Sequence, residues 1–145
     1  MKIKISVLLL LFTTMVAAQP KIEIKNPWVR PAAKGANSAL FFTVINSGAK
    51  ADTLVDASSK VSDNVMIHET YSKGKDMMGM RMVKFVAVPA REEVKFKPHG
   101  LHVMIMELKE DLKLGQTKEF SLVFKKAGTV KVKAMVKDMP AMKGM

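Results

Sequence analysis

The sequence predicts an all-β fold, a single-domain antiparallel β-sandwich or barrel, from residue 21 to about residue 137. Short runs of apolar or alternating residues recur along this stretch, and Pro, Gly, Asn or Ser residues separate them. No segment there repeats apolar residues with the 3.6-residue period of an amphipathic helix. Seven to nine strands at this spacing are typical of an antiparallel sandwich. With 145 residues, 48% of them hydrophobic, the chain can bury an ordinary core for one such domain.

Each expected strand ends at a turn signal. The first, 21–25, is broken by Asn26-Pro27 before an apolar run resumes at Trp28. Residues 39–45 (ALFFTVI) are apolar on both faces and end at an Asn-Ser-Gly turn. The other expected strands are 65–71, 80–88, 94–97, 101–108, 119–124 and 129–136.

Residues 1–18 have the pattern of a secretory signal peptide. Two lysines precede an apolar run, 5–12, that is too short to span a bilayer, and small residues follow it. This predicts cleavage between Ala18 and Gln19 and a periplasmic protein. No cysteine stands at the boundary, so we expect neither a lipid anchor nor a stable membrane anchor after cleavage. An uncleaved anchor at 1–18 is the alternative.

Charge and cysteine content exclude several functional classes. The net charge is +11, but the lysines are spread along the chain and alternate with apolar residues, which indicates solvated strand faces rather than a nucleic-acid site. The absence of cysteine excludes a disulfide scaffold, a thiolate cluster, a blue-copper Cys ligand and a Cys nucleophile. No nucleophile–base spacing or paired-carboxylate motif stands out, so we do not expect an enzyme.

Methionine is unusually abundant, and its positions cluster with histidine. The chain has thirteen methionines and three histidines. His102, Met104 and Met106 occupy every second position of one expected strand, so their side chains share a face. The pairs with the same spacing are Met66 with His68 and Met80 with Met82.

Convergent thioether and imidazole groups predict a site for Cu(I). Thioether sulfur is a soft, neutral donor and imidazole an intermediate one, which favours Cu(I) over hard ions such as Mg²⁺ or Ca²⁺. Thioethers also suit an exported protein, because they cannot be oxidised to a disulfide.

Core packing is the alternative explanation for several methionines. Met66, Met106 and Met135 lie in apolar strands, where methionine commonly fills gaps in the core. Met106 still remains a candidate ligand because it shares a face with Met104. Packing is therefore the expectation for these three residues, with ligation by Met106 left open.

Two other segments remain candidate copper sites. The run 77–82 (MMGMRM) contains a glycine and is typical of an exposed loop edge, which keeps Met77, Met78 and Met82 as candidate ligands, with core packing as the alternative. Residues 138–145 have lost the strand pattern and are expected to form a flexible tail. Its M-x-x-M-x-x-M spacing indicates either an incidental composition or a second copper-capturing arm. The tail methionines are Met139, Met142 and Met145.

The order and spacing of four residues resembles the H-x10-M-x21-H-x-M signature of the periplasmic PCu(A)C copper(I) chaperones. Here eleven residues separate His68 from Met80, twenty-one separate Met80 from His102, and Met104 follows two positions later. The resemblance extends from about residue 21 to residue 137. Flanking matches include PWVR at 27–30, HE at 68–69, MRMV at 80–83, VPA at 88–90 and LHVMIM at 101–106.

The resemblance implies a cupredoxin-like β-sandwich, over residues 19–137, with Cu(I) ligands His68, Met80, His102 and Met104. It also implies delivery of copper toward the CuA centre of cytochrome c oxidase, either directly or through an intermediary thiol chaperone. The expected partners are thus the copper ion and an acceptor protein. A thioether ligand would be displaced by the incoming donor, so that copper passes by ligand exchange.

The chain departs from the family pattern at four places. The gap after His68 is one residue longer, and we expect the turn at 72–76 to absorb it. Met78 could replace Met80 as the second ligand. Thr70 stands where many members have another methionine. His99 stands where glycine is common, and we expect it to be structural, although with a new amine at Gln19 it could bind Cu(II).

Three other functions are consistent with parts of the sequence. A copper storage or resistance protein would use the core site and the Met-rich tail together, and would bind more than one Cu(I). An electron-transfer cupredoxin is disfavoured because its Cys ligand is missing. An exported adhesion or binding module with incidental methionines would show no strong Cu(I) affinity.

Overall fold

The computed structural model describes residues 18–139, which form ten β-strands and no α-helix. Within this range no helix is long and apolar enough to cross a membrane. The strands are β1 (Ile22–Val29), β2 (Ser38–Asn46), β3 (Asp52–Ser58), β4 (Asn64–Gly74), β5 (Met77–Met82), β6 (Val86–Val88), β7 (Glu93–Phe96), β8 (Leu101–Met106), β9 (Thr117–Phe124) and β10 (Gly128–Val136).

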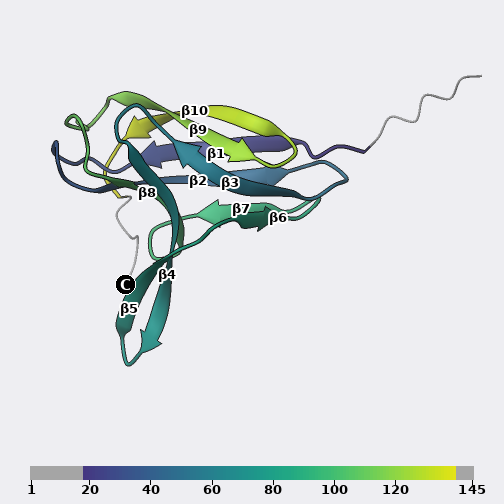
Figure 1. The fold of residues 1–145 in the computed structure, drawn as a ribbon, viewed down its shortest axis with the longest axis horizontal. Helices are drawn as coiled ribbons and strands as arrows, with labels where there is room; N and C mark the ends of the chain where they lie inside the picture. The colour runs from purple at the N-terminus through teal and green to yellow at the C-terminus, as the bar shows by residue number, and fades with distance from the viewer. Residues whose placement is uncertain (1–17, 140–145) are drawn as a thin grey trace, which may run out of the picture.

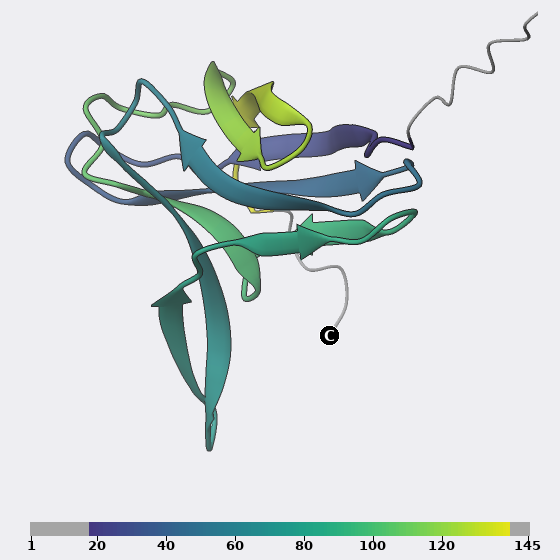
Figure 2. The same ribbon diagram turned by 45° about the vertical axis from the view of Figure 1, so that its right-hand side comes forward.

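The strands form one sheet that folds over on itself, as the sequence predicts for a cupredoxin-like sandwich. Their order is β5-β4-β8-β2-β1-β10-β9-β3-β6, and β7 also pairs with β2. The β1–β10 pair is parallel and the other pairs are antiparallel. Figures 1 and 2 show that the β4–β5 hairpin extends away from the rest of the sheet. The expected copper ligands lie on this hairpin and on the adjacent β8.

One main core fills the interior, and a second small cluster lies on the other side of β2. Leu40 and Phe42 point into the main core, where they meet buried side chains such as Phe120 of β9. Phe41, with the opposite orientation, packs with Trp28 at a ring-centroid distance of 4.6 Å. Because successive strand residues face opposite sides, these two clusters explain why 39–45 has apolar residues on both faces.

Three strand predictions were wrong in detail. β3 was not among the expected strands. In the fold Asp52 is 2% exposed and its carboxylate accepts hydrogen bonds from the backbone N–H groups of Lys126 and Ala127. The expected strand 80–88 divides into β5 and β6. β1 continues through Asn26-Pro27, where a bulge with Asn26 at φ 50° absorbs the interruption.

A break between β7 and β8 creates a turn next to the expected ligands. Both strands pair with β2, one after the other, and the turn at 97–100 projects between them. It is closed by hydrogen bonds from the Lys97 N–H to the Leu101 carbonyl, 2.8 Å, and from the Gly100 N–H to the Lys97 carbonyl, 3.1 Å. His99 within this turn has φ 62°, a left-handed conformation that glycine adopts most easily.

Candidate metal centre

His68 and His102 face each other across two neighbouring strands. They are directly opposed in the antiparallel β4–β8 ladder, and their ring centroids are 6.0 Å apart. Directly opposed residues of an antiparallel pair place their side chains on the same face. The structure therefore brings together two residues that are 34 positions apart in the sequence.

The imidazole of His102 is oriented by a backbone hydrogen bond. His102 is 5% exposed, and its Nδ1 lies 3.0 Å from the Gly100 carbonyl oxygen. A carbonyl can only accept, so this contact assigns the proton to Nδ1 and leaves the lone pair on Nε2. Such an outer contact is the usual way in which a protein fixes the tautomer of a metal-binding histidine.

His68 has an unpaired nitrogen and favours the neutral form. Its Nδ1 is buried and has no hydrogen-bond partner among residues 18–139. Burial, and then the neighbouring His102, lower the pKa of His68 below its ordinary value of 6.5. At neutral pH the ring therefore has a lone pair available, which is the state that a metal ion requires.

Thioethers surround the two imidazoles on the same face. Met104 is opposed to Met66 in the β4–β8 ladder. On β5, Met80 is opposed to Thr70 and Met82 to His68. The side chain of Met80 is 58% exposed, so this part of the site is open to an incoming molecule.

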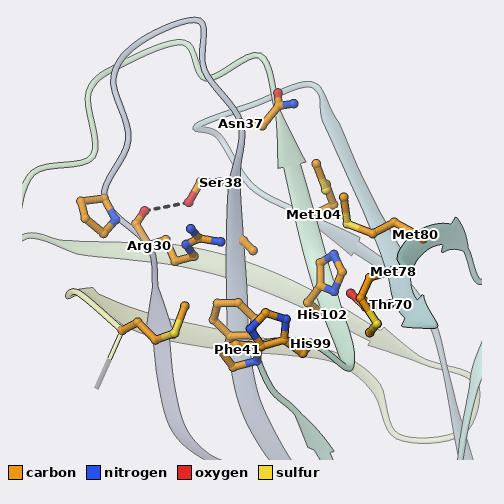
Figure 3. Close-up of a pocket in the computed structure, with 15 residues that line it drawn as sticks. Arg30, Asn37, Ser38, Phe41, Thr70, Met78, Met80, His99, His102 and Met104 are labelled. Atoms are coloured by element: carbon orange, nitrogen blue, oxygen red, sulfur yellow. Dashed lines mark hydrogen bonds between the residues drawn. The ribbon is translucent and has the colours of Figure 1, made fainter. Parts of the chain in front are cut away.

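A pocket of about 450 Å³ lies over this face, and the labelled side chains of Met80 and Met104 both line it (Figure 3). His102 and Met78 also line it, whereas His68 and Met82 are not among its lining residues. The lining residues are Arg30, Pro31, Asn37, Ser38, Ala39, Phe41, Thr70, Met78, Gly79, Met80, Pro98, His99, His102, Met104 and Met139.

A bulge in β4 sets which methionine faces the pocket. Ser72 is opposed to Met78, but Gly74 is opposed to Met77, so Lys73 is an extra residue on the β4 side. This bulge lies within 72–76, the segment in which we expect the longer gap after His68 to be absorbed. Beyond the bulge, regular alternation points Met78, like Met80 two positions later, toward the pocket.

The remaining candidate residues have different positions. Met66 and Met106 are half-buried, which agrees with packing, but Met135 is 52% exposed, so its expected place in the core is wrong. Met139 lines the pocket. Met142 and Met145 lie outside the described residues.

Sequence reasoning missed two residues of the pocket, His99 and Arg30. The glycine-like conformation of the turn brings His99 to the pocket wall, and its local sequence alone indicated only a turn. Arg30 follows β1 and is the last residue of the PWVR match at 27–30, which was not linked to the site. For His99 the available signal was its departure from the family pattern, and for Arg30 it was the PWVR match.

The donor set matches a soft metal ion. Among the described residues no group of three or more His, Asp or Glu side chains could hold a metal ion. The other soft donors on the face of the imidazole pair are thioethers, and these carry no charge. Hard divalent ions prefer oxygen ligands, so this chemistry favours a soft monovalent ion such as Cu(I).

Comparison with known proteins places the chain in a family. Residues 22–136 match the family described as "Putative lipoprotein LpqE-like". "Putative lipoprotein Lxx21020" of Leifsonia xyli subsp. xyli (strain CTCB07) is 32% identical over 118 residues, which cover 81% of this chain and 70% of that protein.

Solved structures with the same fold include PCuAC domains. The copper-bound PCuAC domain from PmoF2 has a TM-score of 0.69 and 28% identity, covering 82% of this chain and 94% of that one. The solution structure of CuI-DR1885 from Deinococcus radiodurans has a TM-score of 0.61 and 30% identity, covering 84% and 81%. The chain therefore belongs to the LpqE-like family, the family of the PCuAC domains.

Proposed function

We propose that the protein is a copper(I) chaperone that binds one Cu(I) through His68, Met80, His102 and Met104. The observation that carries the proposal is the opposed pair of imidazoles, His68 and His102, on a face that also bears the thioethers. One ring has its proton fixed away from the site and the other has an unpaired buried nitrogen. The copper-bound PCuAC domain from PmoF2 and the structure of CuI-DR1885 support this choice of metal.

The exposure of the thioethers supports a carrier rather than an electron-transfer centre. His102 is buried, but Met80 and Met78 are more than half exposed, so one side of the site is open. An incoming donor can displace a thioether while the imidazoles still hold the ion. Because all four donors are neutral, the bound ion keeps its positive charge, which moderates affinity and favours transfer.

The remaining methionines are proposed as auxiliary donors. Met78 lines the same pocket as Met80, and Met82 is opposed to His68. Met106 lies on the same face of β8 as Met104, and Met139 reaches the pocket from the end of β10. With Met142 and Met145, these residues could accept copper during loading or release.

We further propose that residues 1–18 direct export to the periplasm, that 19–137 form the copper domain, and that 138–145 form a Met-rich tail. The word lipoprotein in the name of the relative supports export. The proposed acceptor is the CuA subunit of cytochrome c oxidase or an intermediary thiol chaperone. A chaperone of this kind carries out no chemical conversion.

Transfer of copper tests the function. The Cu(I)-loaded protein is mixed with a copper-free CuA domain under reducing conditions, the two are separated, and copper is measured in each. We expect copper to move to the acceptor, and to move more slowly when both proteins are diluted, because exchange needs contact. Retention of copper, with more than one equivalent bound and the excess lost on removal of 138–145, would instead establish storage.

A further inference from the structure

The pocket beside the proposed ligands is larger than one metal ion needs. Its volume of about 450 Å³ lies in the range of pockets that hold small molecules or several side chains, about 300–1,000 Å³. The proposed donors His102, Met104 and Met80 occupy only part of its wall. The other part is lined by Arg30, with Pro31 and others, and its floor is formed by β2.

Arg30 is the one formally charged side chain among the residues that line this pocket, and no acidic residue lines it. In Figure 3 its guanidinium is turned toward the pocket, on the side away from Met80. Six ion pairs occur among the described residues, and none of them includes Arg30. Asp138, which precedes the lining residue Met139, is likewise in none of these ion pairs.

The backbone that carries this guanidinium is held in place. The Arg30 N–H donates to the Ala39 carbonyl, 3.1 Å, and the Ser38 hydroxyl donates to the Arg30 carbonyl, 2.7 Å. The following residue is Pro31, whose ring fixes its own φ angle. A planar guanidinium on a fixed backbone is well suited to bind a carboxylate through two parallel hydrogen bonds.

We propose that this pocket is the docking subsite for the protein that exchanges copper with this chain, and that Arg30 binds a carboxylate on the partner's loop next to its copper ligand. The inference rests on the proposed function. The uncompensated charge of bound Cu(I) would add to the charge of Arg30, so both attract the same acidic segment. The occupant is thus an extended peptide segment with a soft ligand and an adjacent Asp or Glu.

Two blocked peptides of equal length serve as the probe. Both contain a pair of methionines, flanked by aspartates in one peptide and by asparagines in the other. Each is titrated into the copper-free and the Cu(I)-loaded protein, and binding is followed by amide chemical shifts. We expect the aspartate peptide to bind about two- to fivefold more tightly, the effect of one solvent-accessible ion pair. This preference should decline between low salt and 0.2 M salt.

Arg30→Gln is expected to abolish the preference for the aspartate peptide. The matched control is Lys125→Gln, an exposed cation on the β9–β10 turn that does not line the pocket, and it should leave the preference intact. Equal binding of the two peptides to the unmodified protein would overturn the proposal, and so would a preference that survives in Arg30→Gln.

Measuring both the copper-free and the Cu(I)-loaded protein allows the role of Arg30 to be tested separately from the proposed function. Arg30 is present without copper, so the copper-free protein should also prefer the aspartate peptide. Failure to load Cu(I) would refute the chaperone function while leaving the peptide comparison informative. Normal loading without any peptide preference would refute only the role of Arg30.

Discussion

His68 and His102 are directly opposed in the β4–β8 ladder, with ring centroids 6.0 Å apart, and only His102 has a hydrogen-bond partner for Nδ1. The pair therefore combines one imidazole whose orientation is fixed with one that has an unpaired nitrogen. An orphaned buried polar atom is rare in folded proteins, and a missing ligand is one explanation for it. Four predictions follow from this arrangement and its surroundings.

Copper is expected to bind His102 through Nε2. The Gly100 carbonyl holds the proton on Nδ1, which leaves only Nε2 to coordinate. Long-range ¹H–¹⁵N NMR spectra of the protein with and without Cu(I) can distinguish the two nitrogens, because Cu(I) is diamagnetic. The Nε2 resonance should shift while Nδ1 stays protonated. A shift at Nδ1 with loss of its proton would show that the observed tautomer is not the binding one.

Met80→Ala should weaken Cu(I) binding by at least about tenfold, which is the lower end of what loss of even a supporting contact costs a metal site. Met77→Ala is a matched control. Met77 is 59% exposed and Met80 is 58% exposed, but the two are an odd number of positions apart on β5 and face opposite sides. Competition with a chromophoric chelator gives both affinities. If Met82→Ala weakens binding more than Met80→Ala does, Met82 is the ligand instead.

The stability of the copper-free protein should depend on pH through His68. The unfolded chain takes up a proton near pH 6.5, whereas the folded protein does so only at lower pH, because the pKa of His68 is lowered. Between these two values the unfolded state binds more protons, so the free energy of unfolding falls as pH falls below 6.5. Above this range His68 should contribute no pH dependence.

Urea unfolding of the wild type and of His68→Gln between pH 5 and 8 checks this expectation. The carboxylates titrate in both proteins, so the difference in the free energy of unfolding, wild type minus His68→Gln, isolates His68. This difference should fall as pH falls below 6.5 and stay constant above it. A difference that changes in the opposite direction would mean that folding raises the pKa of His68.

His99→Gly should stabilise the protein without weakening copper binding. The left-handed conformation destabilises the folded state by about 1–2 kcal/mol when the residue has a side chain. Glycine avoids this cost, but it lowers stability by about 0.4–1 kcal/mol because it gives the unfolded chain more conformational entropy. The expected gain is about 0.5–1 kcal/mol, measured by denaturant unfolding. A loss of Cu(I) affinity in this variant would instead identify His99 as a ligand.

The sequence predicts correctly which side chains of β8 lie on the same face, because this depends only on their spacing within the strand. His102, Met104 and Met106 alternate with Val103 and Ile105, and these two are fully buried on the opposite side. The all-β class is predicted for the same reason. That the four family positions lie near one another could be expected only from the resemblance, since β4 and β8 are far apart in the chain.

Features that depend on distant pairing could not be predicted. The division of 80–88 occurs because β5 pairs with β4 while β6 pairs with β3, and no local pattern marks that change of partner. Met135 is a different case, because the local alternation of β10 was enough to place its side chain outside the core. It is exposed because β10 alternates, with Ala134 and Val136 taking the buried positions.

A Cu(I) competition titration of residues 19–145 against a chromophoric chelator, under reducing conditions, tests the central claim most directly. The double variant Met80→Ala/His102→Ala is measured alongside, with Met77→Ala as the control. We predict one tight equivalent of Cu(I) in the wild type and in the control, and its loss in the double variant. Absence of tight binding, or binding that the double variant retains, would contradict a copper site formed by these residues.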